Sequence, residues 1–335
     1  MAPEHGLWGA PQDHARVVAE VDPLTDLPVH SLYGARRTPT AEMLRGLDAL
    51  VVDLQDVGAR YYTFVWTMVL TMKACAVAGV RVIVLDRPNP LGGLLTEGNW
   101  PDPHFASFVG LYPLPVRHGL TIGELAGYLN TTHGLGCDLT VVPMRGWRRR
   151  MLWESTGLPW VAPSPNMPTP DTARVYPGGC LIEGTNLSEG RGTTRPFESI
   201  GAPFLDAHAY AEALARLGLP GVRFRPARFR PTFHKWARRL CGGVQVHVTD
   251  VLRFRPFLTG LGLVAAARAL APGGFAWRQP PYEFEHRRRP FDILCGTDAI
   301  RGAIERGRPL AVLERQWRRP LATWTRVRRR FLLYE

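Results

Sequence analysis

The chain has 335 residues and a formal charge of +12, and 45% of its residues are hydrophobic, which is ordinary for a globular protein. This composition, with 34 Gly and 30 Pro, excludes a mostly disordered chain and a long coiled coil, and no run approaches the roughly 18 apolar residues of a membrane helix. The length predicts two domains or one large α/β domain.

Strands and helices are predicted to alternate over residues 45–145. Apolar runs bounded by turn residues predict buried strands at 47–54, 80–85 and 138–143, and helices at 61–78 and 121–130. Gly79 is suited to end the first helix as a C-cap, and Thr121 with Glu124 has the spacing of a capping box. Because strand–helix–strand units are almost always parallel and right-handed, we expect an open α/β sheet.

Polar segments follow the first two predicted strands, at the sheet edge where open α/β sheets bind ligands. These segments, 53–62 and 86–93, are rich in charged residues, glycine and proline. Neither contains a GxGxxG motif, and the chain has no Walker loop. No cofactor is therefore predicted.

Residues 163–198 form a long polar segment rich in glycine and proline. It is too varied in composition for a flexible linker, and long irregular segments inside compact proteins are usually functional. We place a domain boundary near residue 172, which gives domains 1–172 and 173–335.

Strands and helices are again predicted in the C-terminal part of the chain. Residues 244–248 have the period-2 pattern of a strand, on which His247 is expected to face solvent. Helices are predicted at 257–270, from 297 onward, and at 309–329.

The positive charge is carried almost entirely by arginine, because only Lys73 and Lys235 are lysines. Such a skew is typical of GC-rich coding rather than of selection for an acidic partner. Arginine runs at 148–150, 287–289 and 328–330 can contact phosphates, but no aromatic-interleaved nucleic-acid motif accompanies them. We expect no nucleic-acid partner.

Metal and redox chemistry receive little support. The five cysteines are scattered without a CxxC pair, so neither a zinc site nor a disulfide framework is predicted, and Cys75 is expected in the core. Glu4 with His5 can form a metal site or an acid/base pair, but no HExxH motif and no third ligand accompany them. No metal is therefore expected.

Carboxylates dominate the polar candidates, and some of them are accompanied by arginines. Two carboxylates that flank a bond suit glycoside hydrolysis, in which one protonates the leaving oxygen and the other acts as nucleophile or base. Arginine among them suits an anionic substrate, because guanidinium groups pair with carboxylates. The spacing alone leaves simpler roles open, since Asp53 or Asp56 can cap the following helix and the capping box accounts for Glu124.

Several longer motifs resemble one family in particular, the NamZ-type peptidoglycan exo-β-N-acetylmuramidases. The first is Pro3-Glu4-His5-Gly6-Leu7-Trp8-Gly9, which is similar to a PEHGLRG signature. The others occur in the same order and extend the resemblance over nearly the whole chain: 31–40, 53–63, 85–93, 108–119, 183–193, 241–245 and 292–298.

The resemblance implies a glycoside hydrolase that releases terminal N-acetylmuramic acid from the non-reducing end of peptidoglycan fragments. It also implies a Rossmann-like open parallel sheet domain, a smaller α+β C-terminal domain, and an active-site cleft between them. Glu4 would be the catalytic carboxylate with His5 beside it, and Asp56 and Glu189 are the candidates for a second carboxylate. The predicted substrate-binding residues are Asp53, Arg60, Tyr62, Asp86, Arg87, Asn89, His118, Glu183, Asn186 and Arg191, of which Arg60, Arg87 or Arg191 would bind the lactyl carboxylate.

The chain departs from the family pattern at its start, because members carry a strand–helix unit with an Asn-Gln-Thr-Gly segment before the PEHG motif. We therefore expect a free sheet edge with exposed apolar surface, and Glu4 on a frayed terminus. A truncated, non-catalytic glycan-binding form is the alternative to the enzyme. No signal peptide is predicted, so the chain as written is expected in the cytoplasm, and a start further upstream would make it secreted or periplasmic. The oligomeric state stays open.

Overall fold

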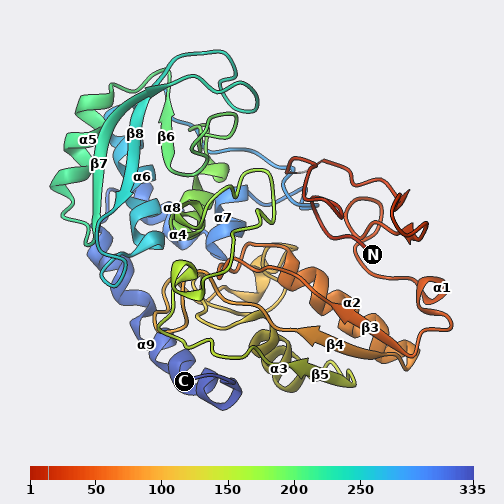
Figure 1. The fold of residues 1–335 in the computed structure, drawn as a ribbon. Helices are drawn as coiled ribbons and strands as arrows, with labels where there is room; N and C mark the ends of the chain where they lie inside the picture. Colours follow the sequence, from red (N-terminus) through yellow and green to blue (C-terminus); the bar gives the residue numbers. More distant parts are fainter. Residues whose placement is uncertain (14) are drawn as a thin grey trace.

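The computed structural model describes residues 1–13 and 15–335 and contains two sheets in separate parts of the molecule (Figure 1). The part that contains the parallel sheet comprises β1 (Glu20–Val21), β2 (Pro28–Val29), α1 (Ala41–Leu44), β3 (Ala49–Val52), α2 (Phe64–Ala78), β4 (Arg81–Leu85), η1 (Pro103–Phe105), α3 (Ile122–Thr132), β5 (Leu139–Val142) and η2 (Trp153–Thr156). The part that contains the antiparallel sheet comprises α4 (Pro170–Gly179), η3 (Cys180–Gly184), β6 (Ser199–Ala202), α5 (Ala207–Arg216), β7 (Val222–Phe229), β8 (Cys241–Val248), α6 (Pro256–Leu270), α7 (Pro290–Cys295) and α8 (Ala299–Glu305). The chain ends with α9 (Leu310–Arg328) and η4 (Arg329–Phe331).

The three predicted parallel strands are confirmed, in the order β3-β4-β5. The first predicted helix begins later than expected, at Phe64, because the preceding backbone pairs elsewhere: the Arg60 N–H donates to the Val116 carbonyl at 2.8 Å. Gly79 ends this helix with φ +69°, a left-handed conformation that glycine adopts without steric cost. The predicted capping box of Thr121 and Glu124 is present at the start of α3.

The second sheet is antiparallel, in the order β6-β8-β7. The predicted strand at 244–248 is the second half of β8, and His247 is exposed on it as expected. Helix α5 packs against both β7 and β8, and α6 packs against α5 (Figure 1). The predicted α/β class, with a parallel-sheet part and a second part that mixes helices with an antiparallel sheet, is therefore confirmed.

Helix α9 joins the two parts of the fold, running from one to the other in Figure 1. Trp317 is buried in the hydrophobic core of the antiparallel-sheet part, and Trp324, two turns later, is buried in the core around the parallel sheet. The Trp324 indole N–H donates to the His118 carbonyl at 2.8 Å. The end of the chain continues this contact, because the Tyr334 hydroxyl donates to Asp86 at 2.6 Å.

The N-terminal segment is held in place, contrary to the expectation of a frayed end. The Ala2 N–H donates to the His30 carbonyl and the Leu32 N–H donates to the Ala2 carbonyl, both at 2.8 Å. Glu4 follows this pairing directly and is only 5% exposed. Backbone bonds to a segment about thirty residues away fix its position, and local sequence does not reveal such long-range pairs.

The expected free sheet edge is present at β3, which pairs only with β4 among the described residues. A hollow of about 420 Å³ runs along this edge. Met1, Leu47 and Val51 line it and are all exposed, Val51 to 56%. Unpaired edges of this kind are sites where another strand can add.

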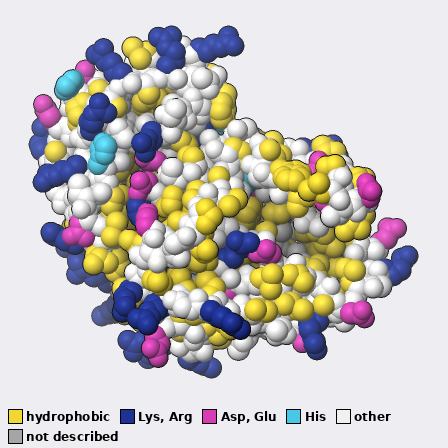
Figure 2. Space-filling view, in the orientation of Figure 1, with side chains coloured by type: hydrophobic (Ala, Val, Ile, Leu, Met, Phe, Trp, Pro, Cys, Tyr) yellow, Lys and Arg dark blue, Asp and Glu magenta, His cyan; other side chains and the backbone are white. Residues whose placement is uncertain are grey.

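Charge is distributed rather than concentrated on the surface that Figure 2 shows, where lysine and arginine side chains lie around the outline of the molecule. Within the described residues, no helix is both long and apolar enough to cross a bilayer.

The crossing of α4 and α6 gives a first testable prediction. A Cβ atom on Gly260 would lie 2.3 Å from the Gly178 carbonyl oxygen, a backbone atom that cannot rotate away. We expect Gly260→Ala to lower the free energy of unfolding by about 1–3 kcal/mol or more in chemical denaturation. Gly127→Ala is the matched control, because Gly127 lies inside α3 with no atom within 4 Å of the added carbon. It should be neutral or stabilise by up to about 1 kcal/mol, and equal losses in both variants would contradict the prediction.

Candidate functional site

A small cavity lies where the N-terminal segment, the turn before α2 and the antiparallel-sheet part meet. Its volume is about 30 Å³. Acidic, aromatic and amide side chains line it: Glu4, His5, Asp13, Tyr61, Tyr62, Thr63, Val109, Ser164, Asn166, Met167, Tyr176, Glu183, Arg191, Phe197, Tyr282 and Glu283. Four carboxylates from three segments that are far apart in sequence therefore line one cavity.

Glu4 is oriented by the residue that precedes α2. The Thr63 hydroxyl donates to Glu4 Oε2 at 2.7 Å, and both side chains are buried. The neighbouring His5 has φ +70°, and its Nδ1 lies 2.8 Å from the Pro11 carbonyl oxygen. Because a carbonyl oxygen can only accept, Nδ1 carries the proton in this contact. The two residues of the predicted catalytic motif thus lie side by side at the cavity.

Glu283 reaches the cavity from the loop between α6 and α7. The Tyr33 hydroxyl lies 3.1 and 3.3 Å from its two carboxylate oxygens and donates to them. Glu283 is 7% exposed. Burial, followed by the negative charges of Glu4 and Glu183, raises the pKa of Glu283 well above its usual range, although the Tyr33 hydroxyl acts in the opposite direction.

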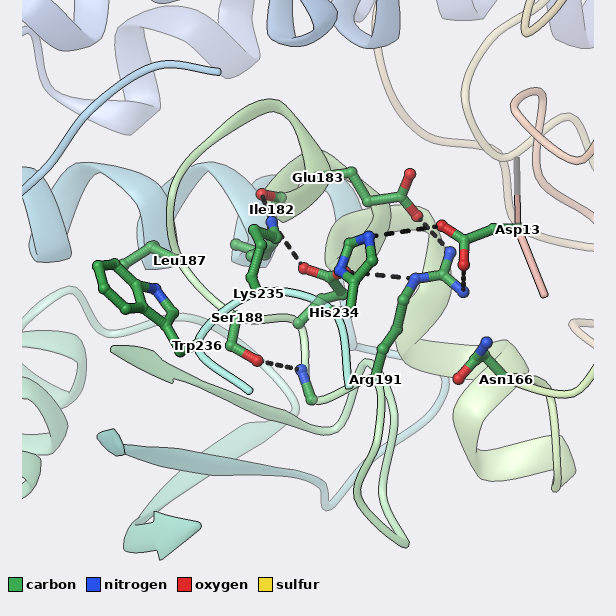
Figure 3. Close-up of polar contacts among 12 residues, drawn as sticks. Asp13, Asn166, Ile182, Glu183, Leu187, Ser188, Arg191, His234, Lys235 and Trp236 are labelled. Atoms are coloured by element: carbon green, nitrogen blue, oxygen red, sulfur yellow. Dashed lines mark hydrogen bonds and ion pairs between the residues drawn. The ribbon is translucent and has the colours of Figure 1, made fainter. Parts of the chain in front are cut away.

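Arg191 also lines the cavity, and Figure 3 shows its guanidinium group among acidic side chains. Its guanidinium nitrogens lie 3.2 Å from Asp13, 2.8 Å from Glu183 and 3.3 Å from Glu189. Tyr282 donates its hydroxyl to the other oxygen of Glu183 at 2.8 Å. With three carboxylates around it, Arg191 holds the acidic groups in place, and its predicted role of binding the substrate's carboxylate is not supported by these contacts.

Glu189 lies behind Arg191 and does not line the cavity. Lys235 approaches Oε2 at 2.7 Å, and His234 approaches Oε1 at 3.1 Å. Burial alone would raise the pKa of Glu189, but Lys235, His234 and Arg191 together hold it well below its usual range. A carboxylate that is surrounded in this way serves as an anchor for cations, so the predicted catalytic role of Glu189 is not supported.

The loop that carries Glu189 and Arg191 packs closely against neighbouring backbone. Gly190 has φ +78°, and a Cβ atom there would lie 2.6 Å from the Ser199 carbonyl oxygen. Lys235 donates to the Ile182 and Thr185 carbonyls at 3.0 and 3.1 Å, which joins the β7–β8 loop to this segment (Figure 3).

Asp56, the other candidate for a second carboxylate, is buried away from the cavity lining. Its Oδ2 accepts from the Gly58 N–H at 2.7 Å and lies 3.4 Å from His118 Nε2. The His118 Nδ1 in turn accepts from the Leu120 N–H at 3.2 Å. These contacts stabilise the turn before α2, and the predicted site roles of Asp56 and His118 are not supported.

The side chains of Arg60 and Asn89 also form hydrogen bonds with backbone groups and do not line the cavity. The Arg60 guanidinium donates to the carbonyls of Asn99, Leu114 and Leu294 at 2.8–3.1 Å. Asn89 donates to the Leu120 carbonyl at 2.9 Å and accepts from the Leu91 N–H at 2.9 Å. Both side chains are buried among these partners, and neither residue lines the cavity.

The remaining predicted residues lie outside the cavity lining as well. Asp53 and Arg87 form a half-exposed ion pair at 2.5 Å. Asp86 accepts from the Thr121 hydroxyl and the Gly123 N–H, and Asn186 is bonded to the backbone at Gly274 and Ala276. Of the predicted site residues, those that the structure brings to the cavity are Glu4, His5, Tyr62, Glu183 and Arg191.

Several cavity residues were not predicted. Ser164 and Asn166 come from the proline-rich segment that the composition marked as functional, so a signal for them existed. Asp13 and Glu283 had none, because neither a motif nor a spacing distinguishes them. Within residues 1–13 and 15–335, no group of three or more His, Cys, Asp or Glu side chains has the arrangement of a metal site.

Comparison with known proteins gives a consistent result. Residues 1–171 match the family described as "Exo-beta-N-acetylmuramidase NamZ, N-terminal", and residues 174–334 match the corresponding C-terminal family. The chain is 46% identical over 332 residues to the peptidoglycan beta-N-acetylmuramidase NamZ of Bacillus subtilis (strain 168), which covers 99% of this chain and 78% of that protein.

Two solved structures from Bacteroides fragilis NCTC 9343, both described as DUF1343 family proteins, have the same fold. The first is 36% identical with a TM-score of 0.86, and the match covers 99% of this chain and 85% of the other. The second is 29% identical with a TM-score of 0.76, and the match covers 94% and 82%.

Proposed function

Because this chain belongs to the exo-β-N-acetylmuramidase NamZ family, we propose that it hydrolyses the glycosidic bond of terminal N-acetylmuramic acid at the non-reducing end of peptidoglycan fragments. The identity of 46% to a named muramidase favours this enzyme over a non-catalytic glycan-binding protein. The motifs on which the sequence analysis relied extend over both matched regions.

The observation that carries the proposal is the meeting of Glu4 with carboxylates of the antiparallel-sheet part in one buried cavity. Glycoside hydrolysis generally needs two carboxyl groups on either side of the scissile bond, one to donate a proton and one to stabilise or attack the anomeric carbon. Glu4 has the features of the second kind. A hydroxyl donor from Thr63 orients it, and both side chains are buried.

The other lining residues suit an amide-bearing sugar. Ser164 and Asn166 present a hydroxyl and an amide, and Tyr62 adds an aromatic face with a hydroxyl group.

A chromogenic pair of substrates tests the proposed function. The chain should release nitrophenol from 4-nitrophenyl β-N-acetylmuramide and discriminate against the matching β-N-acetylglucosaminide, which lacks the lactyl group. A site that bonds a polar substituent rejects the analogue without it strongly, so we expect a ratio of kcat/KM on the order of 10²-fold or more. Equal rates on both substrates would contradict muramic-acid specificity, and no release from the folded chain would contradict the enzyme.

A further inference from the structure

We infer that Lys235 is a positioning residue of the proposed hydrolase, which acts through Glu189 to hold Arg191 beside the acids of the cavity. This inference rests on the proposed function and adds to it a residue that lies outside the cavity lining. It concerns the shape of the lysine side chain as well as its charge.

The first observation is the set of oxygen atoms around the Lys235 ammonium group. It donates to the carbonyls of Ile182 and Thr185 at 3.0 and 3.1 Å, and Glu189 Oε2 lies 2.7 Å from Nζ. The side chain is only 18% exposed, so these oxygens replace most of its water. An ammonium group has three N–H bonds and accepts no hydrogen bond, so three surrounding oxygens suit its charged form. Burial lowers the pKa of Lys235, and the charge of Glu189 acts in the opposite direction.

The second observation is a row of alternating charges that leads from Lys235 to the cavity. Glu189 lies between Lys235 and Arg191, at 2.7 Å from the first and 3.3 Å from the second. Arg191 in turn lies 2.8 Å from Glu183 and 3.2 Å from Asp13, two acids that line the cavity. Lys235 therefore compensates part of the charge of Glu189. Without it, Glu189 would attract Arg191 more strongly and compete with the two cavity acids for the guanidinium group.

The third observation is the conformation of the β7–β8 loop, from which Lys235 projects toward this row of charges (Figure 3). Lys235 is flanked by His234 with φ +67° and Trp236 with φ +59°, left-handed values that residues other than glycine rarely adopt. Such conformations persist where the surrounding structure holds them. Here His234 Nδ1 lies 3.1 Å from Glu189, and the Trp236 indole N–H donates to the Asn186 carbonyl at 2.5 Å. The contacts on both sides therefore fix the place of the ammonium group.

The fourth observation is the presence of lysine itself. Of the 41 lysine and arginine side chains, only Lys73 and Lys235 are lysines, and Lys73 is exposed on α2. An ammonium group is a compact point charge, whereas a guanidinium group is a planar fork with a different set of donor directions. In a chain that otherwise uses arginine, a lysine among three oxygens indicates that the compact group is needed there.

The effect on the reaction follows from the lining of the cavity. Arg191, Glu183 and Asp13 line the same space as Glu4, so a shift of Arg191 changes the walls that would face the sugar. A misplacement of about 1 Å can cost on the order of 10²-fold in rate. Because the walls would contact the sugar both before and during bond cleavage, the loss should appear in KM as well as in kcat.

Two arginine variants test the requirement for lysine. We expect Lys235→Arg to keep the fold but to lower kcat/KM on 4-nitrophenyl β-N-acetylmuramide by about 10–10²-fold, with KM raised at least about threefold. Lys73→Arg is the matched control, because it makes the same change at the exposed lysine of α2. It should keep both kinetic constants of the wild-type chain. Circular dichroism at the assay temperature shows whether each variant is folded.

Chemical rescue tests the ammonium group. Lys235→Cys removes this group and should show a loss of similar size. Alkylation of the new thiol with 2-bromoethylamine places an ammonium group at the same number of bonds from the backbone as in lysine, and it should restore most of the activity. Alkylation with iodoethane adds the two carbons without the amine and should restore little. The five native cysteines are buried, so the new thiol is the accessible one, and intact-mass spectrometry counts the groups added.

The outcomes separate a positioning role from a structural one. A variant that only lowers the amount of folded enzyme reduces the apparent kcat and leaves KM unchanged, and this result would overturn the inference. Wild-type constants for Lys235→Arg, or equal recovery with the two alkylating reagents, would also overturn it. If Lys235→Cys does not fold, the KM and kcat of Lys235→Arg decide the question. A wild-type chain inactive on the muramide would overturn the proposed function, and this inference with it.

Discussion

Replacing Glu4 with glutamine is expected to lower kcat on 4-nitrophenyl β-N-acetylmuramide by at least 10²–10⁴-fold. The amide has the size of the carboxylate, and its carbonyl oxygen can still accept from Thr63, so the surroundings of Glu4 should keep their geometry. What the variant loses is the negative charge that we propose acts on the anomeric carbon. The measurement is initial-rate hydrolysis, with circular dichroism to show that the fold is retained.

Glu20→Gln is the control for this experiment, since it removes an exposed carboxylate of the same N-terminal segment. It should keep the activity of the wild-type chain. If Glu4→Gln retained more than about a tenth of that activity, Glu4 would not be the catalytic carboxylate, and the acids contributed by the antiparallel-sheet part would have to carry the reaction without it.

Replacing Arg191 with methionine is expected to be strongly destabilising. The guanidinium group compensates three buried carboxylates, and methionine keeps much of the aliphatic volume while removing the charge. Leaving a buried ionic partner uncompensated typically costs 3–5 kcal/mol. We expect a loss of about this size in the free energy of unfolding, measured by chemical denaturation, and little remaining activity because the cavity acids lose their positions.

A surface arginine gives the matched comparison. Arg216 and Glu212 form an i,i+4 pair at 3.8 Å in which both side chains are about 70% exposed. Such pairs contribute about 0.3–0.5 kcal/mol, so Arg216→Met should be nearly neutral. If Arg191→Met were as mild as this control, the cluster around Arg191 would not hold the site together.

Local patterns predicted the parallel sheet well. Short apolar runs mark β3, β4 and β5, Gly79 ends α2, and the capping box starts α3, because each of these signals lies within a few residues of the feature that it specifies. The N-terminal segment was misjudged for the opposite reason. Its order depends on backbone pairing of Ala2 with Ser31, and no local pattern encodes that contact.

The lining of the cavity was predicted in part. The motifs include Glu4, His5, Tyr62, Glu183 and Arg191, which line it, but they also include residues whose polar groups bind backbone groups, such as Arg60 and Asn89. In sequence, a polar side chain that binds substrate and one that binds a carbonyl oxygen look the same. Glu283 shows the converse problem, since it meets Tyr33 across 250 positions of chain.

The two tryptophans of α9 link the stability of one hydrophobic core to the stability of the other. Trp317 and Trp324 belong to different cores but to one continuous helix, so unfolding of either core removes packing from the other. We therefore expect the two sheets to unfold as a single cooperative unit, so that Gly260→Ala also lowers the stability of the parallel sheet, with which Gly260 makes no contact.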